Sequence, residues 1–323
     1  MATGAHESVF NDVHDWLNAG KRVWLCTITE TWGSSPRPAG SWLAVSSDGD
    51  WSGSVSGGCL EEDLLNRCIA GGPEQLQFID YGISDQDRDD FRLPCGGHIR
   101  LLVEPLFPER DLPHVDVVLE ALQARNPVAR IVSLATGIAQ CEPAGNRQGG
   151  LTVDDQVLRH DLVPEFRLLL VGAGEVARYV GEFARAADFS VTLCEPRSRF
   201  SEGWVHTGLP LIQALPDDLV SRSFDDPWAG VLALAHDPRV DDMALMAALK
   251  SGASYVGAMG SARTSAQRRN RLASLGVTDE QLGRLRAPIG IDIPSKTPAE
   301  IAISVVADLI VVRQHLRVAR PSL

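Results

Sequence analysis

A glycine-rich turn between an apolar strand and a helix constrains the fold of this chain more than any other feature. The segment GAGEVA (172–177) follows the apolar run FRLLLV and fits the G-x-G-x-x-G/A fingerprint. Gly172 permits a tight turn, and Gly174 lets a ligand approach the helix N-terminus, where N–H groups and the helix dipole hold an anion. Glu195 ends the next strand, where a nucleotide site places an acid that reaches ribose hydroxyls. Either a dinucleotide or a pterin phosphate could bind at this turn.

The alternation of short apolar strands with helices extends this pattern from residue 166 to the end of the chain. Residues 166–197 form a βαβ unit, and the strands 230–236 and 254–260 are each followed by a helix. Thr297 as N-cap, Pro298 and Glu300 mark the start of a long final helix over 297–316. The pattern predicts a Rossmann-like doubly wound parallel sheet over residues 166–323.

The preceding residues predict a different, strand-rich architecture. Residues 1–108 are expected to form an α+β domain with a helix over 7–20, strands over 23–31, 41–55 and 98–106, and a helix over 59–72. Residues 109–165 are expected to form a connecting strand-rich subdomain that extends the first sheet. The fold class is therefore α/β, with domain boundaries near residues 108 and 165.

Composition excludes several functional classes. The 323 residues include 30 Lys and Arg against 42 Asp and Glu, which gives a net charge of -12 and argues against a nucleic-acid binder. No apolar run approaches the roughly 20 residues that cross a bilayer, and the N-terminus lacks the pattern of a secretory signal. Six cysteines are too few for a disulfide scaffold. We expect a soluble cytoplasmic protein with reduced thiols.

Two of the cysteines stand in unusual surroundings. Cys59 follows Ser56-Gly57-Gly58 and opens a predicted helix, a position that lowers a thiol pKa. Cys95 precedes Gly96-Gly97, and the glycines beside both thiols leave room for a ligand or partner to approach sulfur. We expect Cys59 and Cys95 to be functional and to face one shared cavity. The other four are expected to be small buried hydrophobes: Cys26, Cys68, Cys141 and Cys194.

Several strings, in order along the chain, carry a resemblance to a known family. They are GSSPRPAG (33–40), SGGCLEED (56–63), LPCGG (93–97), VGAGEVA (171–177), HDPRVDD (236–242), YVGAMGSARTSAQR (255–268) and APIGIDIPSKTPAEIAISVVADL (287–309). With them the chain resembles the XdhC/CoxI family, accessory factors of molybdenum hydroxylases such as xanthine dehydrogenase. The resemblance implies a non-catalytic chaperone that binds molybdenum cofactor (molybdopterin), protects it during installation of the terminal sulfido ligand, and inserts it into the apo-enzyme. It also implies contact with a cysteine desulfurase and self-association as a dimer.

The resemblance assigns cofactor-binding roles to individual residues. In the N-terminal XdhC/CoxI-type domain they are Arg37, whose guanidinium suits an anion, Cys59, Glu61 and Cys95, and whether a thiol ligates molybdenum stays open. In the Rossmann-like domain the resemblance adds His236, Asp237, Ser261 and Arg263 to the cofactor-binding candidates of the glycine-rich turn, which are Gly172, Gly174 and Glu195. Asp237 can equally be a helix cap.

Two other functions are compatible with parts of the sequence. An NAD(P)-dependent oxidoreductase would explain the glycine-rich turn and Glu195, but no Tyr–Lys or His–Asp catalytic arrangement is visible. A cysteine-based redox switch would use Cys59 and Cys95 without enzymatic activity. Cofactor extraction separates these hypotheses from the chaperone.

One predicted helix is rich in arginine and is therefore positively charged, although the chain as a whole is acidic. Arg263, Arg268, Arg269 and Arg271 fall within nine residues of one predicted helix. They either form a solvated face paired with carboxylates, or divide their roles. In the second interpretation Arg263 points into the crevice at the carboxyl ends of the parallel strands, where it holds an anionic cofactor. The other three arginines then lie on a surface that meets a partner.

Overall fold

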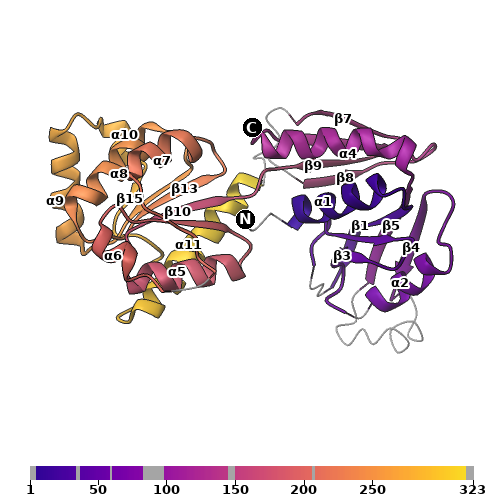
Figure 1. Cartoon of the computed structure of the whole chain (residues 1–323), viewed down its shortest axis with the longest axis horizontal. Coiled ribbons are helices and arrows are strands. Elements are labelled where there is room, and N and C mark those ends of the chain that lie inside the picture. The colour runs from indigo at the N-terminus through magenta and orange to yellow at the C-terminus, as the bar shows by residue number, and fades with distance from the viewer. Residues whose placement is uncertain are drawn as a thin grey trace. The chain divides into compact units, whose positions relative to one another are not determined.

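The chain folds into two compact units, residues 5–164 and residues 165–316 (Figure 1). This computed structural model describes residues 5–33, 37–58, 60–82, 98–144, 150–205 and 208–317. None of the helices within those ranges is long and apolar enough to cross a membrane.

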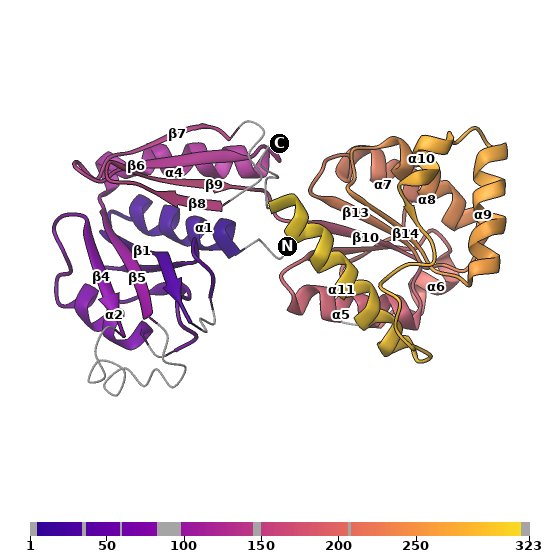
Figure 2. The same cartoon turned by 180° about the vertical axis from the view of Figure 1, so that it is seen from behind.

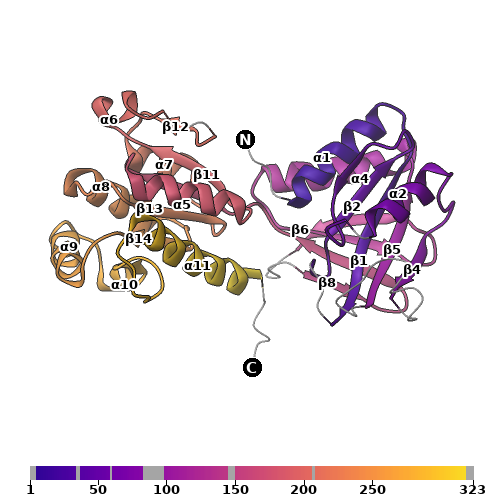
Figure 3. The same cartoon turned by 90° about the horizontal axis from the view of Figure 1, so that it is seen from below.

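A five-stranded antiparallel sheet forms the centre of the first unit. Its strands follow the spatial order β3-β2-β1-β5-β4. They are β1 (Val23–Trp32), β2 (Trp42–Ser46), β3 (Trp51–Gly53), β4 (Gln77–Tyr81) and β5 (His98–Leu106). The helix α2 (Glu61–Ile69) packs on one face, where Leu60 and Leu64 meet Ile28 and Leu101. On the other face α1 (Ala5–Asn18) lies beside α4 (Pro108–Gln123), as Figure 3 shows.

The strands after α4 form a sheet of their own rather than extending the first one, which corrects that expectation. Its order is β7-β6-β9-β8, with β6 (Val128–Ser133), β7 (Ala139–Pro143), β8 (Gly150–Val153) and β9 (Val157–Leu162). It packs against the first sheet through Leu102, Val132 and Leu158. The fully buried guanidinium of Arg130 on β6 pairs with Glu104 on β5 at 2.8 Å. These contacts make residues 109–164 part of the same compact unit as the strands before them.

The second unit is a doubly wound parallel sheet, as the sequence predicts. Its order is β12-β11-β10-β13-β14-β15. The strands are β10 (Arg167–Val171), β11 (Ser190–Cys194), β12 (Leu211–Ile212), β13 (Ala229–Ala233), β14 (Tyr255–Ala258) and β15 (Leu285–Arg286). Their residues face two apolar cores, one on each side of the sheet.

Helices cover both faces of this parallel sheet. In Figure 2, α5 (Glu175–Ala186) and α11 (Pro298–Arg317) lie on one face, where Val180 and Val305 share a core with Leu168. The opposite face carries α7 (Pro216–Ser223), α8 (Pro238–Lys250) and α9 (Ala262–Ser274). Two short helices complete the unit: α6 (Ser198–Glu202) and α10 (Asp279–Gly283).

Three arginines of α9 make contacts within this unit, and the proposed partner surface is wrong for the buried Arg268. Arg268 is only 3% exposed and donates to Asp241 at 3.1 Å and to the carbonyl of Met259 at 2.9 Å. Arg271 pairs with Asp242 at 2.8 Å. Arg269 donates to two backbone carbonyls at 2.7 Å. The buried Arg268 is therefore not available to a partner, whereas the Arg271 side chain is 39% exposed and Arg263 is exposed.

Candidate functional site

The motif residues of the second unit gather at one edge of the parallel sheet. Gly172 and Gly174 follow β10, Glu195 follows β11, and the remaining four follow β13 and β14: His236, Asp237, Ser261 and Arg263. Because parallel strands end at a common edge, all seven predicted residues lie at the carboxyl ends of the strands. The carboxyl-end crevice of a doubly wound sheet is where ligands of this fold bind.

Glycine occupies the two positions of the turn for different structural reasons. Gly172 adopts φ +109°, and a Cβ there would lie 2.4 Å from Cα of Ala235, which follows β13. Gly172 is therefore required by the packing of the turn itself. At Gly174 a Cβ would meet nothing within 4 Å, so the space in front of the α5 N-terminus is open.

That open helix end lacks a side-chain cap. Gly174 occupies the N-cap position of α5 and supplies no side-chain acceptor. Three other helices of this unit are capped: Asp237 accepts from the N–H of Arg239, Ser261 from that of Thr264, and Thr297 from that of Glu300. The short helices α6 and α7 lack a side-chain cap, as α5 does. The first N–H groups of a helix have no partner within it, so the α5 N-terminus presents donors and a positive dipole end. It is the candidate anion site of this unit.

Glu195 has a different task from the one predicted. Its side chain is fully buried, and one carboxylate oxygen accepts from the N–H of Ala173 at 2.9 Å. The Arg197 guanidinium donates to both oxygens at 2.8 Å. Burial opposes the charged form, but the hydrogen bonds from Arg197 and Ala173 outweigh it and lower the pKa of Glu195. With both oxygens engaged, Glu195 braces the glycine-rich turn rather than presenting a carboxylate to a ribose.

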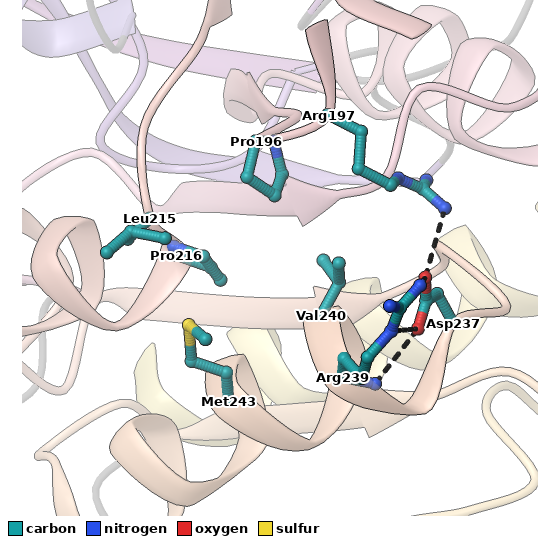
Figure 4. A pocket seen from close by; sticks show the side chains of 8 residues that line it. All are labelled: Pro196, Arg197, Leu215, Pro216, Asp237, Arg239, Val240 and Met243. Carbon is teal, nitrogen blue, oxygen red and sulfur yellow. Dashed lines mark hydrogen bonds and ion pairs between the residues drawn. The ribbon is translucent and has the colours of Figure 1, made fainter. Parts of the chain in front are cut away.

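A pocket of about 290 Å³ opens beside this bracing pair (Figure 4). Asp237 lies at its rim, caps α8, and pairs with Arg239 at 2.9 Å, with Arg197 at 3.8 Å on its other side. The apolar lining comes from Pro196, Leu215, Pro216, Val240 and Met243. This lining is not predicted from the sequence, because Leu215 and Pro216 introduce α7, a short helix with no motif. The local signals for that helix start are Pro216 and the two acids of the first turn, Asp217 and Asp218.

Two motifs of the first unit meet at one end of a sheet. Strand β1 ends at Trp32 and β5 begins at His98, and these two residues are direct partners. They border the strings 33–40 and 93–97. Strand β3, which precedes the string 56–63, runs in the same direction as β1 but ends at Gly53, level with Cys26. Cys59 and Cys95 lie outside the described residues, so their shared cavity stays a prediction, and Arg37 is exposed.

Six hydrogen bonds hold the carboxylate of Glu61, which begins α2. Its carboxylate accepts from the N–H groups of Val55, Ser56, Gly57 and Gly58 at 2.8 to 3.1 Å. The hydroxyls of Ser54 and Ser56 also donate to it. Burial opposes its ionisation, but these hydrogen bonds outweigh burial and lower the pKa of Glu61 to about 2. Glu61 therefore anchors the loop 54–58 and has little capacity left for a ligand.

The described residues offer neither a metal cluster nor an exposed thiol. No group of three or more His, Cys, Asp or Glu side chains among them is placed to hold a metal ion. Cys26, Cys68 and Cys194 are buried as expected, whereas Cys141 is only half-buried.

Comparisons with known proteins agree with the motifs. Residues 168–309 match the family model described as the XdhC Rossmann domain, and residues 16–81 match that of the XdhC and CoxI family. The Molybdenum cofactor insertion chaperone PaoD of Escherichia coli K12 is 28% identical over 325 residues, covering 97% of this chain and 90% of PaoD. A protein of Bacillus subtilis 168 named as a probable xanthine dehydrogenase subunit is 25% identical, covering 91% of this chain and 94% of that protein.

A solved structure shares the whole architecture. The crystal structure of a xanthine dehydrogenase from Bacillus halodurans superposes with a TM-score of 0.72 at 25% identity, covering 95% of this chain and 96% of that one. The two family models, the full-length relatives and this structure confirm the resemblance carried by the motifs. This chain belongs to the XdhC/CoxI family.

Proposed function

We propose that this chain is a molybdenum cofactor chaperone: it binds the cofactor as cargo, protects it during sulfuration, and inserts it into a molybdenum hydroxylase of the xanthine dehydrogenase type. The observation that carries the proposal is the uncapped α5 N-terminus with open space at Gly174. That device holds a phosphate, and molybdopterin carries one. A relative that spans nearly the whole chain is named a molybdenum cofactor insertion chaperone.

Exposed cations at the same edge of the sheet fit a phosphate-bearing cargo. Arg263 is exposed in the first turn of α9, and Arg239 is 88% exposed at the start of α8. Cations in these positions attract an anion toward the carboxyl ends of the strands. The α5 N–H groups would hold the phosphate, and Arg263 would add charge.

A second candidate region is the pair of glycine-flanked thiols of the first unit. Cys59 follows Gly57-Gly58, and Cys95 precedes Gly96-Gly97. A thiol near the terminal sulfido ligand would exclude oxidants and water from it. We assign to this role a cysteine desulfurase as sulfur donor, the client hydroxylase as acceptor, and a cytoplasmic dimer as the working form. No covalent step is required of this chain.

Bound NAD(P) is a weaker alternative, because of Glu195. The acid that would read a ribose is fully buried and has both oxygens engaged by Arg197 and Ala173. A dinucleotide would have to displace Arg197 before Glu195 met a hydroxyl.

Extraction of the bound cargo tests the proposal. The chain is purified from cells that make molybdenum cofactor, oxidised, and heat-denatured. A fluorescent pterin in the extract is expected, and Gly174→Val should reduce its yield while Met243→Leu, in the neighbouring pocket, should not. Release of NAD(P), or robust turnover with NADH, would overturn the proposal.

A further inference from the structure

An exposed indole is held rigidly at the motif end of the first sheet. Trp32 is the last residue of β1 and is 44% exposed, and it belongs to none of the apolar cores of the described residues. Its ring stacks on the imidazole of His98, its direct partner on β5, with centroids 4.3 Å apart and planes 11° apart. A large apolar ring that is ordered yet left in solvent contributes little to folding.

The imidazole under the indole is fixed in turn. His98 Nε2 lies 3.0 Å from Oδ1 of Asp80 on β4. Arg100 Nε is 3.9 Å from the same oxygen, and its guanidinium lies over the ring of Phe78 at 4.7 Å. Three adjacent strands therefore set the plane of Trp32 before any ligand arrives. Such support behind a contact residue is what a preorganised binding site needs.

The position of the indole connects it to the motifs of the chain. Trp32 directly precedes the string 33–40, and His98 directly follows the string 93–97. The other exposed tryptophan of this sheet, Trp51, has neither feature. It pairs with Val45, which pairs with Trp24 near the opposite end of β1. The exposed indole of Trp32 therefore lies next to the motif strings, and that of Trp51 does not.

We propose that Trp32 is a stacking platform for a planar, electron-poor heteroaromatic ring. The electron-rich face of an indole favours such a ring, and stacked aromatic pairs gain stability beyond the area they bury. The inference rests on the function proposed above for the class of ring, which is a pterin. His98 and Asp80 are positioning residues, because they act through the orientation of the indole.

Titration of the full chain with two probes tests the platform. The probes are pterin-6-carboxylate and molybdopterin released from a purified molybdenum enzyme, and the readout is quenching of tryptophan fluorescence. Trp32→Ala is expected to weaken binding about ten- to hundredfold, as loss of one stacking partner does. Trp32→Phe keeps a ring and should stay within about threefold of the wild-type affinity. Trp51→Ala is the matched control and should bind like the wild type.

The outcomes separate this inference from the proposed function. If Trp32→Ala binds both probes as tightly as the wild type, Trp32 is not a stacking platform, even if extraction confirms bound pterin. An equal loss in Trp51→Ala overturns the platform as well. If extraction finds no pterin yet Trp32→Ala alone loses pterin-6-carboxylate, the platform stands and the chaperone proposal fails. Thermal unfolding of Trp32→Ala should stay within about 2 °C, because the side chain lies outside the core.

Discussion

At the scale of single residues, Glu61 carries a pH dependence of its own. Six donors hold its carboxylate, and its pKa of about 2 lies below the ordinary value of 4.5. The charged form therefore stabilises the fold above pH 4.5, and this contribution is lost as pH falls toward 2. Glu61→Gln should lower the free energy of unfolding by about 3 kcal/mol at pH 7 and by little near pH 2. Urea unfolding measures both, with Glu62→Gln, exposed on the same helix, as the control.

Arg268 and Arg263 lie on one helix and should differ sharply in their effect on stability. Asp241, only 1% exposed, accepts from Arg268 and from the N–H of Ala235, so it loses its counter-charge in Arg268→Ala. Breaking a buried pair costs about 3–5 kcal/mol, whereas Arg263→Ala at an exposed site should change unfolding by less than about 0.5 kcal/mol. Denaturation midpoints distinguish them, and equal losses would contradict a structural role for Arg268. The sequence shows a cluster of charge, but burial of Arg268 arises from packing of α9 on α8.

At the scale of elements, the sequence predicts those whose stability is local. The final helix begins as expected, with Thr297 and Glu300 exchanging capping hydrogen bonds. The sequence analysis misses strand β9 (Val157–Leu162), because Arg159, His160 and Asp161 interrupt its apolar pattern. The charged pair among them bonds internally at 2.9 Å, and β9 gains its partner β6 from a distant part of the chain. Such pairing is invisible to local patterns.

Substitutions at the two glycines of the glycine-rich turn should have opposite effects on stability and on anion binding. Gly174→Val places a side chain in open space, so the fold should survive while an anion is kept from the α5 N-terminus. Gly172→Val forces a Cβ onto the backbone of Ala235 at a positive φ, so it should lower the unfolding temperature strongly. Thermal unfolding and retention of extracted pterin, measured on both variants, give the two readouts. A strongly destabilised Gly174→Val would contradict the open site.

At the scale of the whole molecule, the sequence reveals the motif strings but not their convergence. The strings 33–40 and 93–97 meet at one end of the sheet only because β1 and β5 are neighbours in an antiparallel sheet. In the second unit the parallel sheet is predicted, and the edge that carries both Gly174 and Arg263 follows from it. The roles of Glu61 and Glu195 as internal anchors are not predicted, since hydrogen bonds to nearby backbone N–H groups leave no pattern in the residue types.

The two units should respond differently to mild acid, because buried histidines occur in only one of them among the described residues. Burial, with the charges of Arg130 and Arg110, lowers the pKa of His114 to about 2. Burial also lowers the pKa of His160 well below 6.5, whereas His236 and His315 of the second unit are not buried. The unfolded chain binds these protons below pH 6.5 and the folded chain does not, so stability falls as pH drops.

Residues 5–164 should therefore lose about 2 kcal/mol through His114 between pH 7 and pH 5, with a loss in the same direction through His160, while residues 165–316 lose much less. Calorimetry should show two transitions that separate on acidification. Tryptophan fluorescence assigns them, since five of the seven tryptophans precede residue 60. His114→Gln, whatever its cost at pH 7, should make the pH dependence of the first unit shallower. Transitions that shift together, or an unchanged slope in His114→Gln, would show that these imidazoles are protonated within the fold.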